Sequence, residues 1–212
     1  MKTKRKALLL SLCAVLLVVA TVMGTMAYLT STDEVKNTFT VGTAVAITLD
    51  EAKTDANGVK VDPEVRVKEN GYKLMPGHNY TKDPTVHVTG ESCYVFVKVD
   101  NGIADLELTG DATHKTIAQQ MADLGWKAVT VNGVTGLYVY AEGTADKTAV
   151  SGTPNQTDLK VFGEFTVKSD VDYAGLSAFN GKTITIKAYA VQKDGFEDMD
   201  PATIWTTAGL TA

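Results

Sequence analysis

Cysteine and histidine are scarce in this sequence, and their scarcity excludes several classes of site. Two of the 212 residues are cysteine, and only Cys93 lies beyond residue 27, so the remaining chain forms neither an internal disulfide nor a Cys-x-x-Cys metal cluster. The three histidines include no His-Glu-x-x-His motif, which excludes the helical zinc-protease site. A Gly-x-Ser-x-Gly elbow and a phosphate-binding glycine loop are also absent. Cys93 stands in an apolar run, where we expect a buried structural thiol.

Positive charge is also sparse outside the N-terminus. Four of the 20 basic residues stand within the first six positions, whereas all 25 acidic residues come after residue 27. Residues 28–212 therefore carry 16 basic and 25 acidic side chains, a net charge of −9, and Arg66 is their only arginine. A surface with this balance repels phosphate groups. We expect neither a nucleic-acid partner nor binding to an anionic membrane surface.

The first 27 residues have the layout of a secretory signal peptide. Lys2–Lys6 is a basic region, and the run that follows it carries no charge. Thr25 and Ala27 are small residues at positions −3 and −1 of a cleavage site before Tyr28. We predict cleavage between Ala27 and Tyr28 by a signal peptidase during export. The alternative is an uncleaved anchor helix, because the apolar run is almost long enough to cross a bilayer, and this would be the chain's membrane contact.

The rest of the chain shows the period-two alternation of β-strands. The alternation recurs in five segments, which are 39–49, 59–67, 93–99, 159–167 and 183–191. Residues 93–99 are apolar on both faces, which is typical of a central strand that is covered on both sides. About eight strands with turns between them predict an all-β fold. We expect one domain over 28–212, a two-sheet antiparallel sandwich of jelly-roll-like topology with one or two short helices.

Turn residues and helix caps complete the predicted architecture. Asn-Gly occurs five times, and Asn132-Gly133 separates two alternating runs, as expected for the turn of a two-residue hairpin. One short helix is predicted over 114–124, with Thr113 as its cap. A second one is predicted to begin at Asp200, which is followed by proline.

Two groups of residues are candidates for a metal site. His78 and His87 are nine positions apart on neighbouring strand-like stretches, and they are either a metal-binding pair or surface and loop histidines. Segment 194–200 is densely acidic, and its carboxylates either hold a calcium ion or form a solvated loop with a helix cap. These carboxylates are Asp194, Glu197, Asp198 and Asp200, and their spacing does not match an EF-hand. We expect no cofactor, with calcium at this loop as the alternative.

Three stretches of the chain share motifs with one known family. In Gly24–Glu51 a Gly-Thr-x-Ala motif closes the signal, and a Phe-Thr-x-Gly stretch then opens the first strand. In Leu74–Val99 a Pro-Gly pair, a Lys-Asp pair and an apolar strand follow one another. Ile184–Phe196 has the character of a C-terminal strand. On these motifs the chain resembles the TasA/camelysin family of Gram-positive bacteria, whose signals are cut by a dedicated SipW-type signal peptidase.

The resemblance implies a jelly-roll protein that is secreted to the extracellular matrix or cell surface. There it would be a structural component of biofilm fibres, with itself and other matrix proteins as partners. In such fibres the N-terminal segment freed by cleavage adds as a strand to the next subunit, through main-chain hydrogen bonds to an open sheet edge. Here this arm is residues 28–41, and the residues implied in assembly are Tyr28, Leu29, Phe39 and Val41. The alternative is that Phe39–Leu49 pairs within its own domain.

Two further functions stay open beside the structural one. Camelysin is catalogued as a metalloprotease, so the resemblance also allows an exported metal-dependent protease, which would bind zinc at His78 or His87. The third hypothesis is a sandwich module that binds carbohydrate or cell wall, with calcium near Asp194–Asp200. The sequence shows no recognisable zinc motif, and we expect a protein that is not an enzyme.

Overall fold

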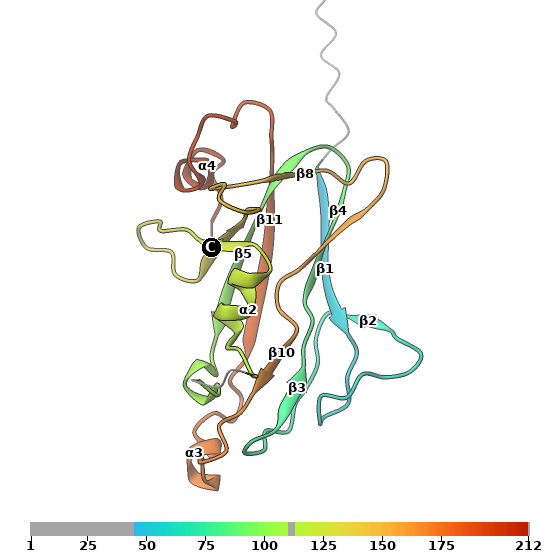
Figure 1. The fold of residues 1–212 in the computed structure, drawn as a ribbon, viewed down its shortest axis with the longest axis vertical. Helices are drawn as coiled ribbons and strands as arrows, with labels where there is room; N and C mark the ends of the chain where they lie inside the picture. The colour runs from blue at the N-terminus through green and yellow to red at the C-terminus, as the bar shows by residue number, and fades with distance from the viewer. Residues whose placement is uncertain (1–44, 110–112, 212) are drawn as a thin grey trace, which may run out of the picture. The chain divides into compact units, whose positions relative to one another are not determined.

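The computed structural model describes residues 45–109 and 113–211 (Figure 1). The predicted cleavage site at Ala27 and Tyr28, and the other assembly residues, Leu29, Phe39 and Val41, lie outside this range. Within the described range the chain is mostly β-structure with short helices, which confirms the predicted all-β class. None of the helices in this range is long and apolar enough to cross a membrane.

The first sheet has the order β2-β1-β4-β9, and all of its strands are antiparallel. Strands β3 and β10 form a separate two-stranded antiparallel ladder. In the sequence, β3 directly precedes β4 and β10 directly follows β9. Alternation places Ile47 and Leu49 toward the core, while Asp50 points to the outer face. The strands are β1 (Ala46–Ala52), β2 (Arg66–Val67), β3 (Asn79–Thr81), β4 (Thr85–Thr89), β9 (Thr157–Lys160) and β10 (Glu164–Thr166).

The second sheet has the order β11-β5-β7-β6, and β8 adds to the end of β5. The chain crosses from the first sheet to the second after β4, returns with β9, and crosses again after β10, which makes a two-sheet antiparallel sandwich. This sheet's strands are β5 (Cys93–Asn101), β6 (Trp126–Ala128), β7 (Leu137–Tyr140), β8 (Ala149–Val150) and β11 (Ile184–Gln192). The predicted hairpin is confirmed, because Val131 and Val134 pair across the turn and Gly133 has a φ of 77°.

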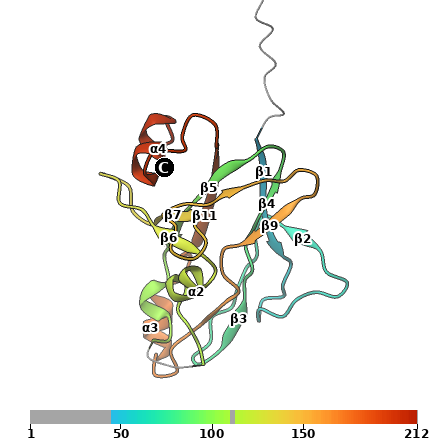
Figure 2. The ribbon, with the colours of Figure 1, turned by 45° about the horizontal axis from the view of Figure 1, so that its top comes forward.

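Strand β5 is buried on both faces, as its apolar sequence predicts. Val95 and Val97 lie in the core between the two sheets, whereas Phe96 belongs to a second apolar cluster on the opposite face. This second cluster is completed by α4 (Pro201–Thr207), whose Trp205 ring lies 5.8 Å from that of Phe96. Figure 2 shows α4 on the side of the β5–β7–β11 sheet that faces away from β1 and β4.

The N-termini of the helices follow from capping side chains. Asp200 caps α4 as predicted, because its carboxylate accepts hydrogen bonds from two amides of the first turn. The helix expected over 114–124 is shorter, α2 (Ile117–Asp123), and its cap is Thr116 rather than Thr113. Thr116 forms a reciprocal capping box with Gln119, an arrangement that Thr113 is too far from the helix to make. The structure adds α3 (Tyr173–Ser177) and the 3-10 turn η1 (Ala104–Leu106).

The strand predicted over 59–67 is largely wrong. Only Arg66–Val67 is a strand, and the side chains of Val59 and Val65 are 61% and 47% exposed. Pro63 lacks an amide N–H, and the exposed side chains of Val59 and Val65 do not pack into the core. The strand predicted over 159–167 is divided between β9 and β10 by residues 161–163, where Phe162 breaks the alternation.

Candidate functional site

A groove of about 1060 Å³ opens along one side of the sandwich, between β1 of the first sheet and β11 of the second. Its walls come from the C-terminal half of β1, the N-terminal half of β11, the segment 68–74 and the region around α3. Apolar side chains that contribute to its lining are Leu49, Tyr72, Leu74, Ile103, Phe165, Leu176, Phe179, Ile184 and Ile186.

The strands beside this groove have free edges. β11 pairs with β5 on one side and has no strand partner on the other among the described residues. β1 pairs with β4 over Ala46–Asp50, and β2 pairs only with its last two residues, Glu51 and Ala52. Within the described chain, Ala46–Asp50 therefore has no strand on its other edge, although the side chains of Lys68 and Arg66 donate to the carbonyls of Leu49 and Asp50. Unpaired N–H and C=O groups on such edges can pair with another strand.

Alternation along β11 gives the groove an apolar wall beside this free edge. Ile184 and Ile186 are partly buried and pack against the core, whereas Thr185 between them is exposed. The rings of Tyr72 and Phe165 form a second wall, which is aromatic, with ring centroids 5.5 Å apart at an interplanar angle of 84°. Main-chain edges with apolar pockets beside them are the two features that strand addition requires.

One part of the groove wall is polar although it is buried. The ammonium Nζ of Lys82 donates to Glu51 Oε2 over 2.5 Å, and the two side chains are only 9% and 5% exposed. The other carboxylate oxygen of Glu51 accepts a hydrogen bond from Asn70 Nδ2 over 3.0 Å. All three residues line the groove.

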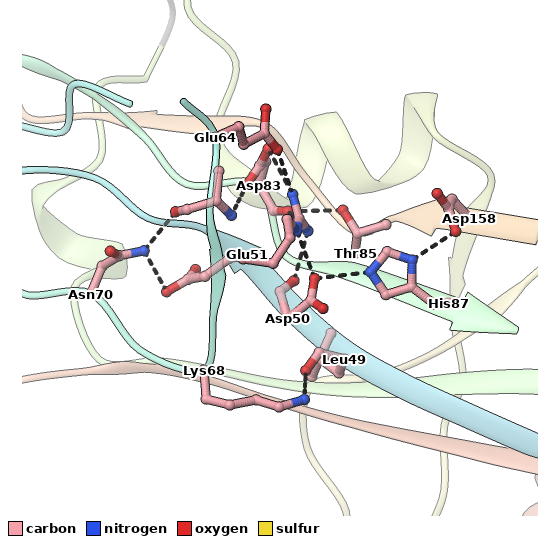
Figure 3. Close-up of polar contacts among 12 residues, drawn as sticks. Leu49, Asp50, Glu51, Glu64, Lys68, Asn70, Asp83, Thr85, His87 and Asp158 are labelled. Atoms are coloured by element: carbon pink, nitrogen blue, oxygen red, sulfur yellow. Dashed lines mark hydrogen bonds and ion pairs between the residues drawn. The ribbon is translucent and has the colours of Figure 1, made fainter. Parts of the chain in front are cut away.

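The outer face of the first sheet carries a network of ion pairs (Figure 3). Arg66 Nε donates to Asp50 over 2.7 Å, and its Nη1 lies 3.4 Å from Asp83. Asp83 also accepts from the amide of Ala52 and from Lys60 Nζ, over 2.7 and 2.8 Å. Burial opposes the charge of Asp83, but Lys60, Ala52 and Arg66 outweigh it and lower the pKa of the carboxyl group.

His87 lies between two carboxylates in the same network, as Figure 3 shows. Its Nδ1 is 2.7 Å from Asp158 on β9, and its Nε2 is 2.9 Å from Asp50 on β1. Burial would lower the pKa of His87, but these two carboxylates outweigh it and raise that pKa. Conversely, His87 lowers the pKa of Asp158, and the pKa of Asp50 is lowered against its burial by His87 and Arg66.

The structure does not bring the two candidate metal-binding histidines together. His78 Nε2 is hydrogen-bonded to the carbonyl of Asn57 over 2.8 Å, whereas both ring nitrogens of His87 contact carboxylates. In the acidic loop, Asp200 caps α4 and Glu197 accepts from the amide of Gly195. Across residues 45–109 and 113–211, no three His, Cys, Asp or Glu side chains are grouped so that they could hold a metal ion.

Cys93 lies at the start of β5 and is fully buried, which is the environment expected for a structural thiol. Burial raises its pKa to about 11, so the thiol is protonated at neutral pH. The sequence patterns predict neither the groove nor its buried polar wall. One sequence signal could have revealed the wall, because Glu51 continues the inward-facing series of Ile47 and Leu49, and a charged residue there requires a partner.

Comparison of the chain with family models, with curated proteins and with solved structures gave no match.

Proposed function

We propose that the chain is a secreted structural protein of an extracellular biofilm matrix, which assembles into fibres by N-terminal strand addition. The observation that carries this proposal is the groove between the free edges of β1 and β11. A strand placed there would gain main-chain hydrogen bonds from an edge, and its alternate side chains would fill the apolar groove. Each subunit would donate one arm and accept another, a head-to-tail contact that extends into a filament when it does not close into a ring.

The sequence provides a donor for this groove. Residues 28–41 follow the predicted cleavage site and include the apolar side chains Tyr28, Leu29, Phe39 and Val41. The resemblance to the TasA/camelysin family supports the same assignment, with self-association and other matrix proteins as partners. A segment freed only after export would postpone assembly until the chain is outside the cell. The proposal assigns the chain a structural rather than an enzymatic role.

Electron microscopy of purified protein tests the role of the arm. We expect filaments from residues 28–212 and none from residues 43–212. Circular dichroism of both forms would check that the shorter one keeps its β-structure. Filaments from the folded shorter form would contradict assembly through this arm.

Paired variants on β11 test the acceptor groove. Ile186→Lys places a charge on the apolar wall, and we expect it to reduce filament formation at least tenfold, because the incoming strand would bury that charge. Gln192→Lys is the matched control at an exposed position of the same strand outside the groove lining, and we expect it to form filaments normally. Equal assembly by both variants would place the acceptor site elsewhere.

A further inference from the structure

An amine, a carboxylate and a primary amide meet at the buried wall of the groove. They come from three distant positions, Lys82 before β4, Glu51 in β1 and Asn70 after β2. Glu51 joins the other two, since one of its oxygens lies 2.5 Å from Lys82 Nζ and the other lies 3.0 Å from Asn70 Nδ2. Figure 3 shows the Asn70 amide directed at Glu51 from the neighbouring segment.

The surroundings of this group are apolar and aromatic. Glu51 and Lys82 are both buried, and Lys82 Nζ lies 5.9 Å from the centre of the Tyr72 ring. Burial raises the pKa of Tyr72 to about 12, so its hydroxyl is neutral and donates to the carbonyl of Thr81. Two opposite charges in such a place are costly to desolvate.

Hydrogen bonds hold both ends of the Asn70 side-chain amide, whose carbonyl carbon Cγ is an electrophile. Its oxygen Oδ1 accepts a hydrogen bond from the backbone amide of Thr54 over 2.9 Å, which polarises the carbonyl and would stabilise an oxyanion there. Its nitrogen Nδ2 donates both to Glu51 and to the carbonyl of Ala52. The Thr54 amide is therefore placed where acyl transfer to this side chain would need an oxyanion donor.

We propose that Lys82 and Asn70 form an intramolecular isopeptide bond, with Glu51 as the group that transfers the protons. Glu51 takes a proton from Lys82, and the neutral Nζ attacks Cγ of Asn70 to give a tetrahedral oxyanion next to the Thr54 amide. Glu51 then accepts a second proton from Nζ on one oxygen and delivers its first proton to Nδ2 from the other. The Cγ–Nδ2 bond breaks, the Cγ–Nζ amide remains, and ammonia leaves and takes the last proton as ammonium.

The balance of this reaction requires no additional reagent. One ammonium side chain and one primary amide give one secondary amide and one ammonium ion, and nothing is oxidised or reduced. Glu51 ends as the carboxylate it was at the start. The bond would join the segment after β2 to the segment before β4, across the end of β1 that lies between them. This inference goes beyond the proposed function and does not depend on fibre assembly.

The intact mass of the full chain under denaturing conditions tests the proposal directly. We expect a mass about 17 Da below the sequence value, which is the loss of one ammonia. After trypsin digestion we expect residues 69–73 joined to residues 74–98 as one branched peptide, because acylated Lys82 is no longer a cleavage site. An unshifted mass for the folded protein would overturn the proposal.

Variants separate this bond from a side reaction at the same asparagine. Asn70 precedes Gly71, whose backbone nitrogen could also attack Cγ, and the resulting cyclic imide has also lost one ammonia. Lys82→Arg and Glu51→Gln should both abolish the mass loss, whereas Lys73→Arg, an exposed position in the same segment, should retain it. A loss of 17 Da that persists in Lys82→Arg, or cleavage of the native chain between Asn70 and Gly71 by hydroxylamine under mild conditions, would assign the change to the imide and overturn the isopeptide bond. Even if a variant fails to fold, the branched peptide from the unmutated chain distinguishes the two products, because only the isopeptide bond joins residues 69–73 to residues 74–98.

Discussion

The outer faces of the two sheets are covered in opposite ways. On the β5–β7–β11 sheet, Phe96 and Tyr189 pack under Trp205 of α4, so this face is an extension of the apolar core. On the β1–β4–β9 sheet, the outward side chains form ion pairs around Arg66 and His87. The apolar side chains under α4 stabilise the fold because they are removed from water. The ion pairs of the charged face contribute less free energy, but they fix how its strands align and leave that face exposed to solvent.

The covered face should give the larger effect on stability. Trp205 is only 2% exposed and contacts the rings of two strands, so Trp205→Ala leaves a large cavity. We expect the free energy of unfolding to fall by about 3–5 kcal/mol, measured by urea denaturation. Trp205→Phe retains an aromatic ring and should lose less. A loss below about 1 kcal/mol for the alanine variant would mean that α4 contributes little to this face.

On the charged face the effect should depend on burial. Asp83 has a side chain only 6% exposed, and its loss leaves the Ala52 amide without its acceptor and removes one carboxylate from Lys60 and Arg66. We expect Asp83→Ala to cost about 2–4 kcal/mol. Glu64→Ala removes a carboxylate that is 51% exposed from the same Arg66, and it should cost less than about 1 kcal/mol. Equal losses would show that burial does not separate the two contacts.

A smaller effect is expected where a cation joins α4 to the second sheet. Lys147 Nζ donates to the carbonyls of Glu197 and Met199, just before α4, and lies 5.1 Å from the ring centre of Tyr94. We expect Lys147→Ala to lower the free energy of unfolding by about 1 kcal/mol, and Lys147→Met, which retains the apolar stem, to lose somewhat less. Thermal melts of the three proteins at one salt concentration would measure this difference.

The smallest effect should appear as a pH dependence of the charged face. The raised pKa of His87 gives stability that is full below the unfolded value near 6.5 and is lost as pH rises through the folded value. The lowered pKa of Asp50 and of Asp158 gives stability that is full above about 4 and is lost on acidification. We expect a decline below about 1 kcal/mol between pH 6 and 8, absent in His87→Gln, measured by melting across that range.

Sequence reasoning succeeds here where the cause is local. The two-sided apolar pattern of 93–99 identifies the central strand, and Asp200 before proline identifies the start of α4, because both signals act within a few residues. The pattern of 59–67 fails because a continuous strand needs a continuous partner. Lys60 makes only an isolated bridge with Thr54, and the paired strand is limited to Arg66–Val67. Thr113 fails as a cap because several threonines precede the helix, and the capping box with Gln119 selects Thr116.

The candidate sites are less predictable for a different reason. The groove exists because β1 and β11, from opposite ends of the described chain, lie beside one another at the open side of the sandwich. Glu51, Asn70 and Lys82 come together through the order of strands in the sheet, which residue spacing does not encode. Their sequence signal is weak, because only Glu51 is a charged residue at an inward-facing position of a strand.

The position of β5 also determines which backbone amides exchange their hydrogens through local unfolding and which only through global unfolding. β5 pairs with β11 over nine residues on one edge, meets β7 and β8 on the other, and is covered on both faces. Its amide hydrogens should therefore exchange with solvent only through global unfolding, while the free edge of β11 exchanges through small local openings. Strand β5 would thus be the slowest-exchanging segment of the sandwich, and an added strand could form and release its hydrogen bonds at the edges without loosening this centre.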